Sequence, residues 1–264
     1  MTNYIIAIPS YNRPELIKKK TLNFLNNNMI NPSQIYIFVA NPEEKKKYIN
    51  SLDMQYWESI IVGVPGLLQQ RKFISNYFKD DQWIFQMDDD VDELWELTDN
   101  KDIKFNSEPF RDLNSFIYSA FKECIKCGTK IWGVYPCDNT YFMRFGISTN
   151  LRLIVGCCFG IINDKQIENN INICEKEDYE RSILYYKKYS CVMRYNYIGV
   201  QTNYFKNKGG LQSLDLNYDR IVEAEKSTKY LLNKYPAYCK RRDKKNISDI
   251  RLILNPIQHS SEPY

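Results

Sequence analysis

The stretch Trp83-Ile84-Phe85-Gln86-Met87-Asp88-Asp89-Asp90 decides the fold that we expect for this chain. A short run of aromatic and β-branched residues is typical of a buried strand. Three adjacent carboxylates cannot continue that run, because each would lose its hydration without a partner. The stretch therefore predicts a strand that ends at the edge of a sheet and places its acids in a cleft, where open α/β sheets bind ligands.

The three carboxylates also predict a bound cation. Like charges this close repel one another unless a cation lies among them, and hard oxygen ligands suit Mg²⁺ or Mn²⁺. The alternative is an acidic surface turn. Asp92 and Glu93 follow the triplet and could begin a short helix, where acids suit the helix dipole.

Composition limits the class of protein. The 264 residues are 44% hydrophobic and 14% aromatic, enough for a large core. No run reaches the ~20 apolar residues that a membrane span needs, and no signal-peptide pattern is present. The eight scattered cysteines are therefore expected to be reduced, in a cytoplasmic compartment. A net charge of +4 is compatible with phosphate or nucleic-acid ligands but does not identify them.

Histidine and cysteine do not point to a catalytic centre. His259 is the one histidine and lies near the end of the sequence, which argues against a Ser-His-Asp or Cys-His mechanism. Cys124 and Cys127 have zinc-like spacing, but they lie in a helical pattern without a second pair. We expect buried structural thiols.

Strands and helices alternate in the first part of the chain. Strands are predicted at 4–8, 35–39, 59–62 and 83–87, with helices over 14–25, from 41–44 onward and over 67–78. This alternation predicts a mostly parallel sheet with right-handed crossovers.

The second part is less regular. Helices are predicted over 110–127, 179–189 and 216–234, and strands over 131–134, 151–162 (a pair or one bent strand) and 191–200. Residues 136–150 predict a loop or hairpin over the cleft, and residues 206–210 a flexible basic loop. We expect one domain over 1–264, with halves at 1–95 and 96–264.

Polar groups follow several elements of the first half. Ser10, Tyr11, Asn12 and Arg13 follow the first strand, Arg71 lies at the start of the third helix, and Asp88 to Asp90 follow the fourth strand. In an open sheet these ends converge on one edge. An arginine, a helix amino terminus and a metal-binding acid cluster together suit a diphosphate. The alternative for either arginine alone is a surface salt bridge.

In this order the segments resemble nucleotide-sugar-dependent glycosyltransferases of the GT-A fold. The resemblance rests on Ile6-Ala7-Ile8-Pro9-Ser10-Tyr11-Asn12-Arg13 as the opening strand and loop, Gly66 to Lys72 as the Gly…Ala-Arg-Asn segment, Asp88-Asp89-Asp90 as the Asp-x-Asp motif and Glu177-Asp178 as the later Glu-Asp element. Gln-Arg-Lys replaces the usual Ala-Arg-Asn, and the Gln-x-x-Arg-Trp motif of processive enzymes is absent. Processive polysaccharide synthesis is therefore not expected.

The resemblance implies an α/β, GT-A type fold, with a Rossmann-like, mostly parallel sheet flanked by helices and an acceptor-side mixed half. It implies metal-dependent transfer, with Mn²⁺ or Mg²⁺, of a sugar from a nucleotide-diphosphate sugar, above all a UDP-sugar, to a hydroxyl. The implied donor-binding residues are Pro9, Ser10, Tyr11, Asn12, Arg13, Arg71, Asp88 and Asp89, and the implied metal ligands are Asp90 and Asp88. Lys206 or Lys208 could close over the donor and stabilise the leaving group, or could lie on a solvated loop.

A carboxylate must accept the proton of the attacking hydroxyl if the reaction inverts the sugar. The resemblance assigns that role to Asp178, while its neighbour Glu177 is an alternative base and Glu175 stays open. If the reaction retains configuration, no such base is needed and Asp178 only orients the acceptor.

A more distant similarity is to the small glycosyltransferases that accompany thymine- or methylcytosine-hydroxylating dioxygenases in phages and related viruses. It rests on Pro-Ser-Tyr-Asn-Arg, the Asp triplet and Asn-Lys-Gly-Gly-Leu-Gln at 207–212. It implies a hydroxymethylated pyrimidine in DNA as acceptor and, for a virus, the host cytoplasm. The cluster Lys240 to Lys245 would then follow phosphates, and Tyr141, Phe142 and Phe145 could stack on an extruded base; otherwise they are a solvated tail and a core loop.

Other function classes stay open. One is a glycosyltransferase that acts on a glycan, a lipid carrier or a small molecule, and another is a non-catalytic nucleic-acid-binding protein. A sugar-1-phosphate nucleotidyltransferase would share the architecture, but it should have a Gly-x-Gly-x-Arg loop after the first strand. No membrane partner is predicted, and the pattern leaves the oligomeric state open.

Overall fold

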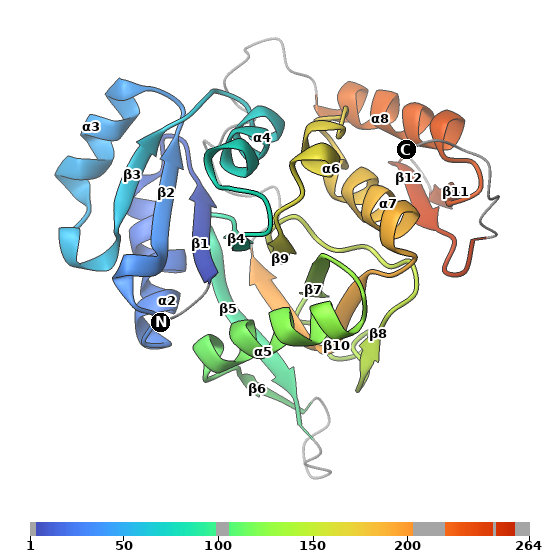
Figure 1. The fold of residues 1–264 in the computed structure, drawn as a ribbon, viewed down its shortest axis with the longest axis horizontal. Coiled ribbons are helices and arrows are strands. Elements are labelled where there is room, and N and C mark those ends of the chain that lie inside the picture. The colour runs from blue at the N-terminus through green and yellow to red at the C-terminus, as the bar shows by residue number, and fades with distance from the viewer. Residues whose placement is uncertain (1–3, 99–105, 203–219, 245–246, 257–264) are drawn as a thin grey trace.

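A large mixed sheet forms the centre of the protein. The computed structural model describes residues 4–98, 106–202, 220–244 and 247–256. The sheet has ten strands in the order β3-β2-β1-β4-β9-β7-β10-β5-β6, with β8 paired to β10. Helices lie against the sheet, and a separate β11–β12 hairpin packs beside α8 (Figure 1).

The first half is parallel, as the alternation predicts. Its strands are β1 (Tyr4–Pro9), β2 (Ile35–Val39), β3 (Ser59–Val62) and β4 (Trp83–Met87), and its longer helices are α3 (Pro42–Ser51) and α4 (Leu67–Tyr77). The helix predicted over 14–25 is present as α1 (Pro14–Ile17), a π-helical turn (Lys18–Leu22) and α2 (Asn23–Asn27). Strand β1 pairs parallel with β2 and β4, and β2 with β3.

The second half is mixed. It contains β5 (Val91–Leu97), β6 (Ser107–Pro109), β7 (Ile131–Tyr135), β8 (Ile147–Ser148), β9 (Cys158–Ile162), β10 (Met193–Thr202), β11 (Cys239–Lys244) and β12 (Ile247–Leu252), with α5 (Leu113–Lys126), α6 (Lys165–Asn169), α7 (Glu177–Tyr189) and α8 (Arg220–Lys234). Strand β9 is antiparallel to both β4 and β7, and β10 is parallel to β7 but antiparallel to β5.

Two local predictions are wrong. The short helix at Asp92 and Glu93 is instead part of β5, because Val91 and Leu94 are fully buried and the segment pairs with β10. The strand predicted over 151–162 is present only as β9. Residues 151–157 form no strand, and their backbone groups bond to several other elements; the Ile154 N–H, for example, donates to the Ser182 hydroxyl in α7.

The two faces of the sheet bury separate cores. Ile6 and Phe85 point to the face covered by α1 to α3 and α5, whereas Ala7 and Ile84 point to the face covered by α4, α6, α7 and α8. This alternation is the period of two that a strand imposes. Covering helices on both faces leave the strand ends as the place where polar groups collect.

Several strands deliver their carboxyl ends to one edge, which we call the carboxyl edge. Strands β1 to β4 are parallel, and β4 and β7 share a direction because each is antiparallel to β9. The segments after β1, β3, β4 and β7 therefore begin there. No described helix is long and apolar enough to cross a membrane, and all eight cysteines are free.

Candidate active site

Arg71 ties helix α4 to the acid triplet. Its guanidinium is almost fully buried, and Nη2 donates to Asp88 Oδ1 at 2.9 Å and to the Gly156 carbonyl at 2.6 Å. Nη1 donates to Gln86 Oε1 at 3.0 Å. The guanidinium also lies over the Phe159 ring at 5.3 Å. Arg71 is therefore a buried ion-pair residue and not a surface one.

Glu177 lies on the other side of the same guanidinium. Its Oε1 is 3.0 Å from Arg71 Nε and 3.4 Å from Arg181 Nη1. Arg181 is fully buried, and its Nε lies 3.2 Å from Glu168 Oε1. Its guanidinium lies 4.8 Å from the centre of the Phe159 ring, the same ring that Arg71 contacts. Buried charges need such pairing. Two cations thus engage the Glu177 carboxylate.

Gly156 connects Asp178 to this cluster. Its N–H donates to Asp178 Oδ2 at 3.4 Å, while its carbonyl accepts from Arg71. Asp178 Oδ1 also accepts from the Tyr179 N–H at 3.0 Å. A Cβ at position 156 would lie 3.0 Å from Glu177 Oε1, so a glycine suits this crowded position. The backbone of one residue, Gly156, thereby joins Arg71, which pairs with Asp88 after β4, to Asp178 at the start of α7.

Asp89 organises the loop after β1. The carboxylate is buried and accepts from the Ser10 hydroxyl at 2.5 Å and from Arg13 Nη1 at 2.9 Å. The Tyr48 hydroxyl bonds to Ser10 Oγ at 2.6 Å and accepts from the Arg13 N–H at 3.0 Å. This closed network fixes where Arg13 presents its guanidinium.

The remaining residues of that loop lie beside this network. Pro9 ends β1 and is buried, Tyr11 is half-buried, and Asn12 is exposed with φ of 54°. The Asn12 N–H donates to Glu44 Oε2 at 2.5 Å. Glu44 and Tyr48 could not be singled out from sequence, because an acid in a first helical turn and a tyrosine on an apolar face are ordinary helix features.

Asp90 contacts both Thr202 and Arg13. Its Oδ1 accepts from the Thr202 hydroxyl at 3.0 Å, and its Oδ2 lies 3.6 Å from Arg13 Nη1. Thr202 ends β10, so this hydrogen bond joins two segments that are 112 residues apart in the sequence.

Burial makes several of these carboxyl groups hard to ionise. Burial raises the pKa of Asp88 to about 7 against the opposing effect of Arg71, with Asp90 and Asp89 adding to the rise. Burial likewise raises the pKa of Asp89 to about 6, against Arg13. The pKa of Asp178 is raised to about 7 by burial and then by the charge of Glu177. A cation beside the triplet would offset the cost at Asp88 and Asp89.

The carboxylates of the triplet fit a metal ion that is also coordinated by phosphate oxygens. Among the described residues, no group of three or more His, Cys, Asp or Glu side chains could hold an ion. Mg²⁺ at nucleotide sites commonly takes one or two carboxylates and completes its shell with phosphate oxygens and water. The Asp88 and Asp90 side chains are 31% and 15% exposed and suit this role, whereas Asp89 is 6% exposed and already engaged.

Other predicted site residues lie elsewhere. Glu175 is buried and contacts Arg220 at 3.2 Å. Lys206 and Lys208 fall outside the described residues, as does the run at 207–212. Of the predicted basic cluster, Lys240, Arg241 and Arg242 are exposed on β11 and not in a tail.

Arg71→Met should destabilise the protein strongly. Removing one member of a buried ion pair costs about 3–5 kcal/mol, and Arg71 serves two carboxylates. The free energy of unfolding in urea measures this loss. Arg111→Met is the matched control, because the Arg111 side chain is 60% exposed and its pair with Glu93 is worth about 0–1 kcal/mol. Equal losses of unfolding free energy in the two variants would contradict a buried Arg71 that stabilises the fold through two carboxylates.

Comparison with known proteins supports the fold. No protein-family model and no curated protein matches the sequence. The crystal structure of glucosyl-3-phosphoglycerate synthase from Mycobacterium tuberculosis, in complex with Mn²⁺, UDP and glucosyl-3-phosphoglycerate, matches with a TM-score of 0.51 at 8% identity. This match covers 97% of this chain and 88% of that one.

A second solved structure is less similar. It is a protein from Desulfovibrio desulfuricans G20 named as a nucleotide-diphospho-sugar transferase, with a TM-score of 0.41 at 9% identity, covering 74% of this chain and 80% of that one. The first match confirms the predicted α/β fold of the GT-A type, with a mixed central sheet flanked by helices.

Proposed function

We propose that this protein is a metal-dependent glycosyltransferase that moves a sugar from a nucleotide-diphosphate sugar to an acceptor hydroxyl. The observation that carries the proposal is the link from Asp88 through Arg71 and Gly156 to Asp178 at the carboxyl edge. A protein of the same fold binds Mn²⁺ and UDP, which supports a nucleoside-diphosphate donor, UDP-linked in particular.

The transfer exchanges one bond at the anomeric carbon. The acceptor oxygen forms a bond to that carbon, the bond to the diphosphate oxygen breaks, and the nucleoside diphosphate leaves with the electron pair. The acceptor proton passes to a carboxylate. Arg13 lies at the strand ends where it can stabilise the developing negative charge.

Asp88 and Asp90 would hold the divalent ion. Mn²⁺ or Mg²⁺, when bound, supplies positive charge to the diphosphate leaving group. Asp89 instead positions Arg13 and Ser10 through its buried hydrogen bonds. The triplet thus divides into two ligands and one positioning residue.

Asp178 is the better base of the two predicted carboxylates. The Glu177 carboxylate is held between the guanidiniums of Arg71 and Arg181, which leaves it less available to an acceptor hydroxyl. In the described part of the chain, the Asp178 carboxylate accepts hydrogen bonds from two backbone N–H groups, and its pKa of about 7 suits proton transfer near neutral pH. We therefore assign an inverting course to the transfer.

The acceptor that we propose is a hydroxymethylated pyrimidine in DNA. Three aromatic side chains in the segment after β7 are unusually open to solvent: Tyr141 is 67% exposed, Phe142 53% and Phe145 60%. Exposed rings of this kind stack on unpaired bases. Their exposure argues against a core loop.

Turnover with defined substrates tests the proposal. The protein is incubated with a UDP-sugar, Mn²⁺ and an oligonucleotide that contains 5-hydroxymethyl pyrimidines, and the oligonucleotide mass is measured. We expect a gain of one sugar that requires both the metal and the hydroxymethyl group. Transfer to a glycan or small molecule instead would overturn the DNA acceptor, and binding of DNA without any use of a nucleotide sugar would overturn the enzyme.

The rate should depend on pH through Asp178. A base with a pKa of about 7 gains activity as the pH rises through 7, because only its deprotonated form accepts the proton. An aspartate with an ordinary pKa would give this rise in activity near pH 4. We expect kcat at saturating donor and metal to rise through neutral pH and then level off. A flat profile from pH 5 to pH 8 would exclude a base of this pKa.

A further inference from the structure

Three arginines of this protein differ in their partners from those that form ion pairs. Those that contact a described carboxylate are Arg13, Arg71, Arg111, Arg181, Arg220 and Arg241. In the described part of the chain, no carboxylate lies within ion-pair distance of Arg144, Arg152 or Arg194. These three gather in and around the segment between β7 and β9.

Arg194 is the most buried of the three. Its residue is only 9% exposed, and its guanidinium bonds to neutral groups, with Nε donating to Asn196 Oδ1 at 2.9 Å and Nη1 to the Leu153 carbonyl at 3.4 Å. The guanidinium lies over the Tyr135 ring at 5.0 Å. Burial and the nearby charge of Arg152 lower the pKa of Arg194 to about 10. A buried cation beside another cation is costly unless an anion binds there.

Arg152 is the accessible member of the pair. It is half-buried, and its Nε donates to Asn150 Oδ1 at 3.1 Å, again a neutral acceptor. A half-buried guanidinium can contact a ligand from solvent, and the positive charge of Arg194 nearby favours an anionic ligand. The fork of guanidinium donors matches phosphate oxygens.

The pair lies close to the candidate active site. Phe159 in β9 pairs with Gln86 in β4 and with Gly133 in β7. Asp88 comes two residues after Gln86, and Tyr135 comes two residues after Gly133. The two residues therefore lie opposite each other, on either side of β9. Two strand spacings separate them by about 10 Å. The ring under Arg194 is therefore a near neighbour of Asp88 on the acceptor side of the sheet.

The exposed aromatic segment adjoins the same pair. Ser148 and Ile147 in β8 pair with Arg194 and Tyr195 in β10. Arg144, just before β8, uses its guanidinium on the carbonyls of Tyr141 and Met143. Rings for bases and arginines for phosphates thus occur together, as in proteins that bind single strands.

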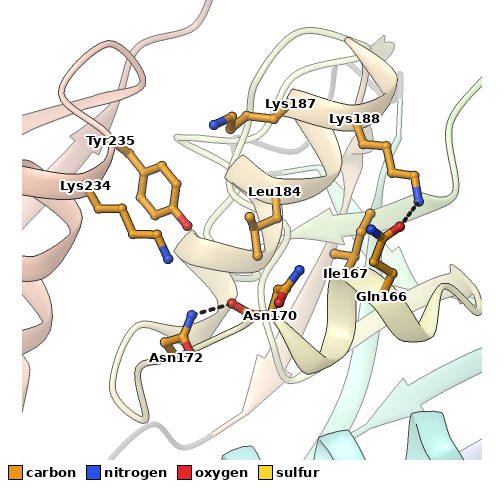
Figure 2. Close-up of a pocket in the computed structure, with 9 residues that line it drawn as sticks. All are labelled: Gln166, Ile167, Asn170, Asn172, Leu184, Lys187, Lys188, Lys234 and Tyr235. Atoms are coloured by element: carbon orange, nitrogen blue, oxygen red, sulfur yellow. Dashed lines mark hydrogen bonds between the residues drawn. The ribbon is translucent and has the colours of Figure 1, made fainter. Parts of the chain in front are cut away.

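A pocket on the opposite side of α7 gives a useful contrast. It has a volume of about 260 Å³ and lies between α6, α7 and α8 (Figure 2). Lysines line it too, but Lys188 pairs with Asp164 at 2.7 Å and Lys234 with Glu180 at 3.4 Å. Lys188 and Lys234 have carboxylate partners within the protein, whereas Arg152 and Arg194 have none among the described residues.

We propose that Arg152 and Arg194 bind a backbone phosphate of a nucleic-acid strand whose base enters the site beside Asp178. The assignment rests on the proposed glycosyl transfer and adds the surface that holds its acceptor. Arg152 contacts the phosphate directly, and the buried Arg194 adds a second positive charge close to it. Tyr141, Phe142 and Phe145 stack on neighbouring bases.

Binding of a labelled single-stranded oligonucleotide, followed by fluorescence anisotropy over a range of salt concentrations, tests this subsite. Each phosphate contact on a single strand contributes about 0.7 to the slope of log K against log salt. We expect Arg152→Gln to weaken binding and to lower the slope by that amount. Arg152→Lys should keep most of the slope, because it keeps the charge. Arg111→Gln, which changes an exposed arginine paired with Glu93, should change neither quantity.

Two outcomes would overturn the subsite. One is an unchanged slope in Arg152→Gln. The other is that inorganic phosphate raises the thermal stability of the unaltered protein, but not of Arg152→Gln, while the oligonucleotide does not bind; the site would then serve a small phosphate compound. Thermal stabilisation by UDP and Mn²⁺ is measured in the same variants. It should be unaffected by Arg152→Gln, and its absence from the unaltered protein would count against the donor site and not against this subsite.

Discussion

Asp178→Asn should lower kcat by about 10²- to 10⁴-fold, the usual contribution of a general base. Asparagine has nearly the same shape, and its single carbonyl oxygen can keep the hydrogen bond from the Tyr179 N–H while the one from the Gly156 N–H, at 3.4 Å, is lost, so the start of α7 should stay in place. It cannot take up the acceptor proton. Donor affinity should stay within a few-fold of the unaltered protein, since Asp178 does not contact the acid triplet directly.

Glu177→Gln separates the base from its neighbour. This substitution removes a carboxylate from two buried arginines, so it should lower the free energy of unfolding by about 3–5 kcal/mol. Steady-state kinetics and urea unfolding on both variants give the comparison. If Glu177→Gln lost the acid limb of the pH profile and Asp178→Asn kept it, Glu177 would be the base.

Asp90→Asn should reduce turnover by at least about 10²-fold, because losing one group that stabilises transition-state charge typically costs 10²- to 10³-fold. The loss should appear together with weaker Mn²⁺-dependent binding of UDP in calorimetry. The fold should be intact, since the Asp90 side chain is at the edge of the sheet, 15% exposed, and asparagine can still accept the hydrogen bond from Thr202.

Asp92→Asn is the control for that variant. Asp92 lies two residues further on, is 33% exposed and pairs with Lys20 at 2.6 Å. It should leave both turnover and Mn²⁺-dependent binding unchanged. Normal turnover in Asp90→Asn, or equal losses in the two variants, would remove Asp90 from the metal site.

The first half of the fold was predictable because its signals are local. Each strand of 4–87 is a short apolar run, and Pro14, Pro42 and Gly66 mark the helix starts. Local runs of this kind fix element type, and alternation fixes the parallel order. The acids after β4 followed from the same reasoning, since carboxylates cannot extend a buried strand.

The second half was less predictable because its order depends on pairing between distant segments. Strand β9 enters between β4 and β7 in the antiparallel sense, and nothing in 151–162 marks where the strand begins. The Asp90–Thr202 bond and the position of Gly156 between Arg71 and Asp178 depend on that pairing. Asp92 and Glu93 suggested a helix, yet burial of Val91 and Leu94 outweighed their preference.

The wrong or incomplete inferences share a cause. The sequence alone left Glu177 open as an alternative to Asp178 for the base. The structure distinguishes them by their neighbours, because Glu177 faces two guanidiniums and Asp178 faces backbone amides. Similarly, Arg152 and Arg194 are unremarkable in sequence, and only the absence of a described carboxylate around them sets them apart.

Anomalous diffraction from a crystal soaked with Mn²⁺ and UDP tests the central claim most directly. The account predicts one manganese peak in contact with Asp90, Asp88 or both, with the UDP phosphates completing its coordination. A fully bound UDP with no manganese at the triplet, or manganese bound only elsewhere, would contradict it.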